Sequence, residues 1–304
     1  MHVDVQYRQS KIAEMIMTMP PDPSQSENTY VLDAESATEM ARLMHQDALM
    51  TQAMGGVFPE RENLAGIRAI LDIGCGPGGW VLDVVREYPE VEVTGIDISQ
   101  TMVEYARAHA MARGFSNATF RIMNALKPLE FPDNSFDLVN ARTITAFMYP
   151  AAWPALLKEV MRICRPGGTI RLTEGELPLT NSLAYETLNN MLSRAMFLAK
   201  RTFSPDGRHL GITPVLAHLL RDAGFHNIQK RVYVSEYIPG TDVYEGLYQD
   251  AQIGFPLVAP FLIQLGVTTK EEFERLHQLL LAEMLSDNFC AVAFPVTVWG
   301  QKPE

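Results

Sequence analysis

The sequence predicts an α/β protein built on a doubly wound, mostly parallel sheet of seven strands, with helical caps from both ends of the chain. Three observations support this prediction. An apolar run at 70–73 leads into a glycine-rich turn at 74–79 and then into a helical pattern. Apolar strands and amphipathic helices then alternate up to residue 173. Further helical patterns precede the first strand and the last one.

The turn after the first strand is the most informative segment, and it reads Asp72-Ile73-Gly74-Cys75-Gly76-Pro77-Gly78-Gly79. A sharp bend that lets a ligand approach the main chain needs positions without a Cβ atom. The glycines match the dinucleotide-binding pattern G-x-G-x-x-G, which alone is a weak signal. Asp72 discriminates, because its carboxylate would repel a pyrophosphate and suits a ligand that carries positive charge.

Further signals follow this turn in a consistent order. Residues 91–97 form a strand that ends in Asp97, which is placed to accept hydrogen bonds from ribose hydroxyls. Ser99 then caps a helix that Gly114 stops. Later strands are predicted at 120–126, within 131–142 and at 169–173.

This ordered series resembles the class I S-adenosylmethionine-dependent methyltransferases, in particular the branch related to quinone-biosynthesis and other small-molecule enzymes. The resemblance implies a Rossmann-like methyltransferase fold, S-adenosylmethionine as the cofactor, and in-line methyl transfer to a small, rather apolar acceptor. The cofactor-binding residues that it implies are Asp72, Gly74, Cys75, Gly76, Gly78, Asp97, Ile98, Met102, Asn124, Ala125, Leu126 and Asn140. Asn124 departs from the family pattern, which usually has an aspartate, but an amide carbonyl can accept the same adenine hydrogen bond.

Four residues are candidates for contacting the acceptor or moving a proton: Tyr30, His45, Arg142 and Glu174. Arg142 and Glu174 end the fourth and fifth strands, at the carboxyl edge where open α/β sheets bind ligands. Arg142 is a candidate anchor for an anionic group, and Glu174 for a proton acceptor. Tyr30 precedes the first helix and His45 lies on it, which makes His45 a candidate base. For each of the four, ordinary packing or a surface contact is the alternative.

Composition limits the remaining function classes. The chain has 304 residues, of which 47% are hydrophobic and 20% charged, as in ordinary soluble enzymes. Its formal net charge of −11 disfavours contact with nucleic acid or anionic membranes. No apolar run approaches the roughly 18 residues of a membrane span, and the first residues lack a signal-peptide core. We expect a cytoplasmic protein with a small-molecule acceptor, no nucleic-acid partner and no membrane insertion, and we leave homodimer formation open.

The cysteines bear on one alternative within the family. Cys75, Cys164 and Cys290 are expected on a turn, a helix and a strand, and no pair has metal-ligand spacing. Arsenite methyltransferases resemble this core but need several accessible thiols. We therefore interpret the cysteines as buried structural thiols in a reducing compartment, and we expect no metal site.

The chain divides into four predicted segments. These are an N-terminal arm (1–30), a lid helix region (31–66), the core (67–237 plus 289–304, with a cap helix at 182–200) and a helical cap insertion (238–288). Ser36 and Glu39 form a capping box that opens the lid helix.

Within the core, the sixth strand is predicted at 228–237 and the last at 289–299, where Pro295 requires a bulge or an edge. A loop as long as 238–288 needs its own structure or a function. We expect this segment, with its aromatic residues Tyr248 and Phe261, to close the acceptor pocket together with the lid helix.

Two other functions stay open on the sequence alone. A nicotinamide-dependent oxidoreductase would share the glycine pattern, although Asp72 and the later strands argue against it. A noncatalytic protein that keeps S-adenosylmethionine as a structural ligand would share every motif named above.

Overall fold

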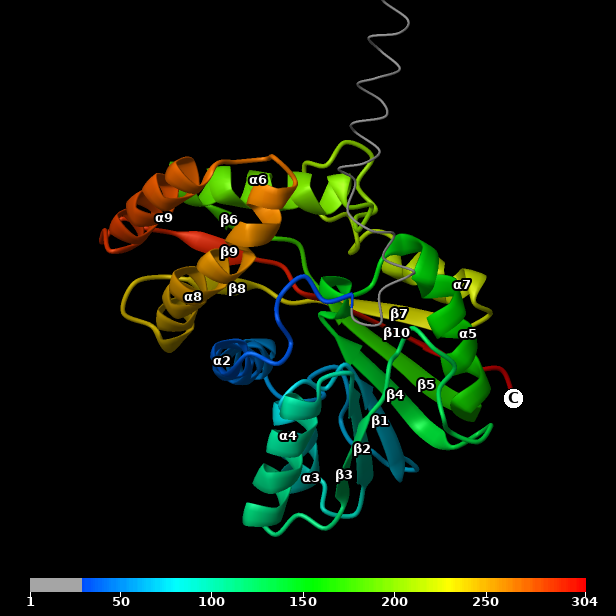
Figure 1. The fold of residues 1–304 in the computed structure, drawn as a ribbon. Coiled ribbons are helices and arrows are strands. Elements are labelled where there is room, and N and C mark those ends of the chain that lie inside the picture. Colours follow the sequence, from blue (N-terminus) through cyan, green and yellow to red (C-terminus); the bar gives the residue numbers. More distant parts are fainter. Residues whose placement is uncertain (1–28) are drawn as a thin grey trace, which may run out of the picture.

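The computed structural model describes residues 29–304, so the predicted N-terminal arm, apart from Thr29 and Tyr30, lies outside the described residues. A seven-stranded sheet with helices on both faces forms the centre, and a helical cap lies over one edge of it (Figure 1). This arrangement confirms the predicted doubly wound fold. In the described part of the chain, no helix is long and apolar enough to cross a membrane.

The central sheet has the strand order β3-β2-β1-β4-β5-β10-β7. Its strands are β1 (Ala69–Ile73), β2 (Glu92–Asp97), β3 (Ala118–Ile122), β4 (Phe136–Arg142), β5 (Cys164–Glu174), β7 (His226–Val232) and β10 (Val296–Gln301). Strand β10 runs antiparallel between β5 and β7, whereas the pairs among β1 to β5 are parallel. Parallel strands bring their carboxyl ends to one edge, which the cap covers (Figure 1).

Both faces of the sheet are packed because successive side chains of a strand point to opposite sides. Ile70 of β1 packs with the cluster on the α3 and α4 face, whereas Leu71 and Ile73 pack with the α5 and α7 face. The helices on these faces are α3 (Gly79–Glu87), α4 (Gln100–Ala112), α5 (Trp153–Ile163) and α7 (Leu216–Asp222), and short 3₁₀ turns η2 (Ile144–Ala146) and η3 (Pro150–Ala152) follow β4.

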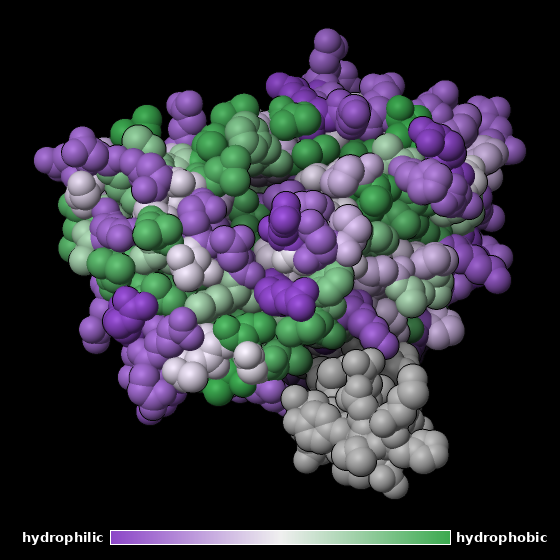
Figure 2. Space-filling view, turned by 90° about the horizontal axis from the view of Figure 1, so that it is seen from above, coloured by the Kyte–Doolittle hydropathy of each residue, from purple (hydrophilic) through white to green (hydrophobic). Residues whose placement is uncertain are grey.

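The cap is assembled from distant parts of the chain. Its helices are α2 (Ala37–Met54), α6 (Leu183–Leu198), α8 (Asp242–Gln264) and α9 (Lys270–Met284). Beside them lies a small sheet in the order β6-β9-β8, from strands β6 (Leu179–Thr180), β8 (Ser235–Tyr237) and β9 (Ala291–Ala293). Helices α6, α8 and α9 share one apolar core. Seen from above, groups of apolar side chains lie among polar side chains on the surface (Figure 2).

The predictions of single strands over 228–237 and 289–299 are wrong. Each segment is split, and its halves belong to different sheets: β7 and β10 to the central sheet, β8 and β9 to the small one. Pro295 lies at the second break, between β9 and β10, where its missing N–H costs no ladder hydrogen bond. Its carbonyl accepts a hydrogen bond from the Tyr233 N–H at 2.9 Å.

Two cysteines differ from their predicted surroundings. Cys164 is the first residue of β5 rather than part of a helix, although it is buried as expected. Cys290 precedes β9 and is exposed, so the prediction of a buried strand position is wrong. The lone thiol at this position points outside the packed cap.

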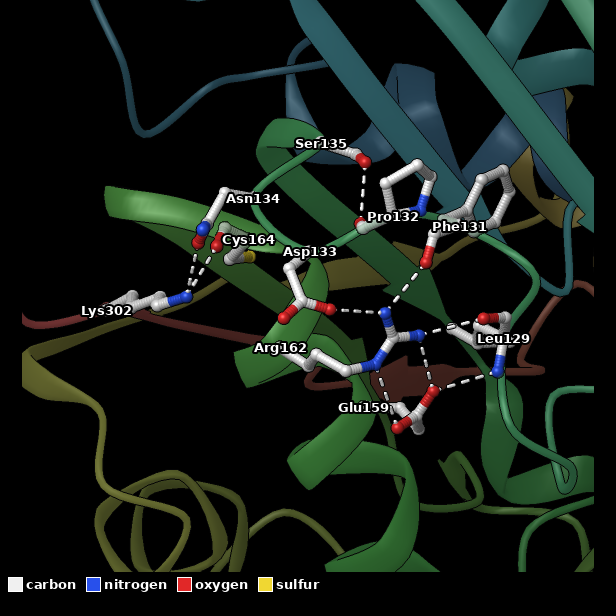
Figure 3. A network of polar contacts seen from close by, with 10 residues as sticks. All are labelled: Leu129, Phe131, Pro132, Asp133, Asn134, Ser135, Glu159, Arg162, Cys164 and Lys302. Carbon is white, nitrogen blue, oxygen red and sulfur yellow. Dashed lines mark hydrogen bonds and ion pairs between the residues drawn. The ribbon is translucent and has the colours of Figure 1, made fainter.

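A polar network anchors the loop between β3 and β4 (Figure 3). Arg162 near the end of α5 donates to the Leu129 and Phe131 carbonyls at 2.8 and 2.7 Å, and it pairs with Asp133 at 2.9 Å. Glu159 holds the same guanidinium and accepts from the Leu129 N–H at 2.9 Å. The network fixes a loop whose first residues, 123–126, line a cavity at the carboxyl edge of the sheet.

Candidate active site

A cavity of about 750 Å³ lies between the carboxyl edge of the central sheet and the cap. Its walls come from the ends of β1, β2, β4 and β5 on one side and from α2, α6 and α8 on the other. This is the crevice in which open α/β sheets bind ligands. The volume lies within the range of small-molecule sites.

The glycine turn contributes Gly74, Cys75, Gly76, Pro77 and Gly79 to the cavity wall. Gly74 and Gly76 have φ values of 69° and 51°, which residues with a Cβ atom adopt rarely. A Cβ atom on Gly76 would meet only the Leu43 side chain, at 3.9 Å, so its Cα faces open space. Gly78 differs, because a Cβ atom there would lie 2.7 Å from Phe120. The structure thus places Gly78 against the core and outside the cavity.

Asp97 lines the cavity at the end of β2. Its Oδ2 accepts the Gly76 N–H at 2.9 Å and its Oδ1 accepts the Ser99 N–H at 2.9 Å. Burial raises the pKa of Asp97, although these backbone donors favour its charged form. Each carboxylate oxygen has a second lone pair that a ligand hydroxyl can use.

Asp72 lies on the cavity wall above a buried polar chain. The Asn140 amide donates to Asp72 at 2.7 Å, and Arg171 donates to the Asn140 carbonyl at 2.8 Å. Glu60 pairs with Arg171 at 2.5 Å. Burial raises the pKa of Asp72 to about 7. Asn140 lies outside the cavity, so the structure makes it a support for Asp72.

The remaining cofactor candidates share the same end of the cavity. These residues are Cys75, Ile98, Met102, Asn124, Ala125 and Leu126. The Asn124 side-chain carbonyl accepts the Leu126 N–H at 2.8 Å, which shapes the turn. The sequence motifs therefore converge on one surface.

Arg142 and Tyr30 also line the cavity, but side chains of α2 already bind their polar groups. The Arg142 guanidinium donates to Thr51 at 3.0 Å and forms an ion pair with Asp47. The Tyr30 hydroxyl donates to Glu39 at 2.6 Å. Both residues thus hold the lid helix, and the Arg142 charge is paired within the protein.

Glu174 is buried at the end of β5 and lines the cavity. Thr145 of η2 donates to it twice, through its hydroxyl at 2.5 Å and its backbone N–H at 3.2 Å. Burial nevertheless raises the pKa of Glu174 to about 7. His45 lines the opposite wall on α2, where its ring lies beside Gly246 of α8.

Arg42 is a charged residue that the sequence motifs do not single out, and it joins helix α2 to helix α8. Arg42 of α2 binds Glu39 at 2.6 Å and Asp250 of α8 at 2.5 Å. Ser36 caps α2 as predicted, but the Glu39 carboxylate of the capping box turns inward to Tyr30 and Arg42. The i, i+3 spacing of Glu39 and Arg42 was the available signal, and it equally fits a solvated helix face.

On the acceptor side of the cavity, the two aromatic residues that were predicted to close the pocket lie elsewhere. Tyr248 and Phe261 are partly buried and pack against the apolar core of the cap instead of lining the cavity. Phe255 of α8 and Tyr185 of α6 form its wall. No group of three or more potential metal ligands occurs among residues 29–304.

Known proteins with a similar sequence or fold identify the family of this chain. Residues 70–168 match the family described as Methyltransferase domain. Probable methyltransferase ltbC of Aspergillus luteorubrus is 30% identical over 70% of this chain and 77% of its own length. Demethylmenaquinone methyltransferase of Geobacillus kaustophilus is 28% identical over 57% of this chain and 77% of its own length.

Two other relatives are matched over less than half of their own length. The chain covers 29% of phosphoethanolamine N-methyltransferase 3 of Arabidopsis thaliana, at 30% identity over 52% of this chain. It covers 40% of an uncharacterized methyltransferase of Schizosaccharomyces pombe, at 33% identity over 36% of this chain.

Solved structures agree on the fold. The YcgJ protein of Bacillus subtilis superposes with a TM-score of 0.52 at 20% identity, over 83% of this chain and 99% of its own. Phosphoethanolamine N-methyltransferase 2 of Haemonchus contortus, in complex with S-adenosyl-L-methionine, gives a TM-score of 0.51 at 18% identity, over 83% of this chain and 52% of its own. With the strand order and the cofactor motifs above, the chain belongs to the class I S-adenosylmethionine-dependent methyltransferases.

Proposed function

We propose that this protein transfers the methyl group of S-adenosylmethionine to a small, rather apolar acceptor by in-line displacement. The observation that carries the proposal is that one cavity brings the motif residues at the sheet edge opposite the apolar residues of the cap. One end of this cavity therefore matches the cofactor motifs of the family, and the other end offers space for an acceptor.

The residues at the sheet edge fit the cofactor. Gly76 leaves open space beside the main chain, and Asp97 offers carboxylate lone pairs beside it. The Asp72 carboxylate, supported by Asn140, suits a cationic ligand. When bound, S-adenosylmethionine supplies an electrophilic methyl group on a positively charged sulfur.

The protein contributes mainly position and exclusion of water. Methyl transfer needs the nucleophile held close to and in line with the methyl group, and a closed pocket that keeps water out provides this. Helices α2 and α8 form such a roof, since Gly246 of α8 lies against His45 and Leu49 of α2. We propose that Arg142 and Tyr30 position α2 through Asp47 and Glu39.

We propose Glu174 as the group that takes the acceptor proton where the acceptor is protonated. Its pKa of about 7 lets it accept a proton near neutral pH, where an ordinary carboxylate is a weaker base. His45 on the opposite wall is the second candidate base.

We also infer a cytoplasmic location. Two of the three cysteines are buried and all three are free thiols, which suits a reducing compartment. The net charge of −11 supports the absence of a nucleic-acid partner. Homodimer formation stays a prediction.

Isothermal titration with S-adenosylmethionine, S-adenosylhomocysteine and NADH tests the cofactor assignment. We expect both sulfur compounds to bind and NADH not to. Mass spectrometry of S-adenosylhomocysteine released with a panel of phenols, quinols and amines then tests catalysis. Tight NADH binding would favour an oxidoreductase, and cofactor binding without turnover on any acceptor would favour a noncatalytic binder.

A further inference from the structure

We propose that the cap end of the cavity selects an uncharged acceptor, and that the hydroxyl of Tyr185 hydrogen-bonds to an oxygen atom of that acceptor. This inference rests on the proposed function, because it names the acceptor class of the same site. Three features of the cap carry it: the Tyr185 hydroxyl, its polar neighbours, and the pairing of the cations in the wall.

Tyr185 is buried in the first turn of α6 and lines the cavity. Its ring packs edge-on against Phe255, with centroids 5.5 Å apart, which fixes its orientation. Among the described residues, none forms a hydrogen bond with its hydroxyl. The hydroxyl oxygen itself is not among the fully buried side-chain atoms that lack a partner, so it opens onto the cavity and has a partner to gain there. A ligand in the cavity is the natural source of that partner.

The neighbours of Tyr185 are polar. Asn189 lies one turn further along α6, lines the cavity and donates to the Pro178 carbonyl at 2.9 Å, which leaves its own carbonyl available. Tyr237 and Asp250 line the same cavity, and the carboxylate of Asp250 adds to burial in raising the pKa of both tyrosines. The cap side of the cavity therefore carries polar groups beside the Tyr185 ring.

The surrounding wall is apolar. Helices α6 and α8 contribute the aliphatic and aromatic residues Leu192, Met196, Leu247, Ile253, Phe255 and Val258. Such a surface favours a hydrophobic body, and the polar group then fixes the orientation of that body.

The charges in the wall exclude an anionic acceptor. Among the described lining residues, the basic side chains are Arg42, Arg142 and the imidazole of His45, and no lysine is present. Arg42 is bound by Glu39 and Asp250, and Arg142 by Asp47. A phosphate or carboxylate would therefore lose its hydration without gaining an unpaired guanidinium or ammonium, and it would face the carboxylate of Asp250. A hydroxyl or carbonyl group of a neutral molecule avoids both costs.

Paired probes test the charge selection. Binding of 1,4-dihydroxynaphthalene and of its monophosphate ester is measured by titration into the protein saturated with S-adenosylhomocysteine. We expect the neutral diol to bind at least tenfold more tightly. Equal or tighter binding of the monophosphate, or no binding of the diol, would overturn the proposal. Cofactor titration in the same preparation separates this outcome from failure of the methyltransferase assignment.

The variant Tyr185→Phe tests the hydroxyl, because it keeps the ring and its packing. We expect the affinity for the diol to fall about tenfold, with the cofactor Kd unchanged. Tyr244→Phe is the matched control: the Tyr244 hydroxyl donates to the Met284 carbonyl within the cap and does not line the cavity. If Tyr185→Phe binds the diol like the unaltered protein, or if both variants lose the same affinity, Tyr185 does not recognise the acceptor.

Discussion

Arg42 on α2 and Asp250 on α8 form an ion pair of 2.5 Å across a sequence separation of 208 residues. Gly246 and Gly254 lie on the same side of α8, four residues before and after Asp250. A Cβ atom on Gly246 would overlap Leu49, and one on Gly254 would touch Arg42 at 3.6 Å. The two helices thus approach closely where α8 lacks side chains, and the ion pair joins them at the centre of this contact.

The first prediction concerns this contact. Asp250→Asn removes the charge that α8 presents, while Glu39 keeps its partner Arg42. Because Asp250 is partly exposed, the loss should be on the order of 1 kcal/mol, enough to open the cap more often. We expect faster proteolysis near Pro239 and Gly240, with protection on adding S-adenosylhomocysteine.

Glu274→Gln is the control for this prediction, because Glu274 pairs with Lys270 on the exposed side of α9. That substitution should leave the cleavage rate unchanged. Equal cleavage rates in both variants and in the unaltered protein would show that the ion pair does not hold the cap.

The second prediction concerns the glycine turn. Gly76→Val places a side chain in the open space beside the main chain at a φ of 51°. The affinity for S-adenosylmethionine should fall at least tenfold, which is about 1.4 kcal/mol. Gly114→Val is the matched control, since Gly114 has a φ of 71° and open surroundings away from the cavity. Folded Gly76→Val with normal affinity would contradict the cofactor assignment.

The third prediction concerns Asp97, which holds the turn and is expected to bind the ribose. Removing a charged acceptor costs about 1.5–3 kcal/mol per hydrogen bond. Asp97→Ala should therefore weaken S-adenosylmethionine and S-adenosylhomocysteine equally, and it should lower the melting temperature because Gly76 and Ser99 lose their acceptor. Loss of affinity for only one of the two compounds would place Asp97 near the methyl group.

The fourth prediction concerns pH. Glu174 has its pKa raised from 4.5 to about 7 in the folded protein, so between these values the folded state binds more protons than the unfolded state. The free energy of unfolding should therefore fall as pH rises through this window, by about 3 kcal/mol from Glu174 alone. Asp72, with a pKa raised to about 7, adds to the same trend.

Glu174→Gln should flatten this dependence in chemical denaturation at pH 5 and pH 8, because glutamine does not titrate and still accepts from Thr145. If Glu174 is also the proton acceptor, kcat of the unaltered protein should rise through pH 7, and the variant should lose that rise. An unchanged stability profile in Glu174→Gln would show that Glu174 is not the titrating group.

Local chemistry made much of the core predictable. The Asp72 turn, the Ser99 cap and the Ser36 cap depend on residues a few positions apart, and each forms as predicted. The lid and cap helices were also predictable, since their boundaries depend on capping residues and apolar spacing. The sequence itself, through these neighbouring residues, determined the central fold and the family.

Contacts between distant segments decided the rest. Gly78 and Asn140 fit the motif as well as Gly76, yet packing against Phe120 and bonding to Asp72 place them outside the cavity. The 228–237 and 289–299 segments each look like one strand, because a local pattern does not show which sheet a residue joins. Tyr185 and Asp250 carried no signal of their own. Their roles arise only where α6, α8 and α2 meet, since burial, pairing and pKa depend on neighbours that the chain brings together by folding.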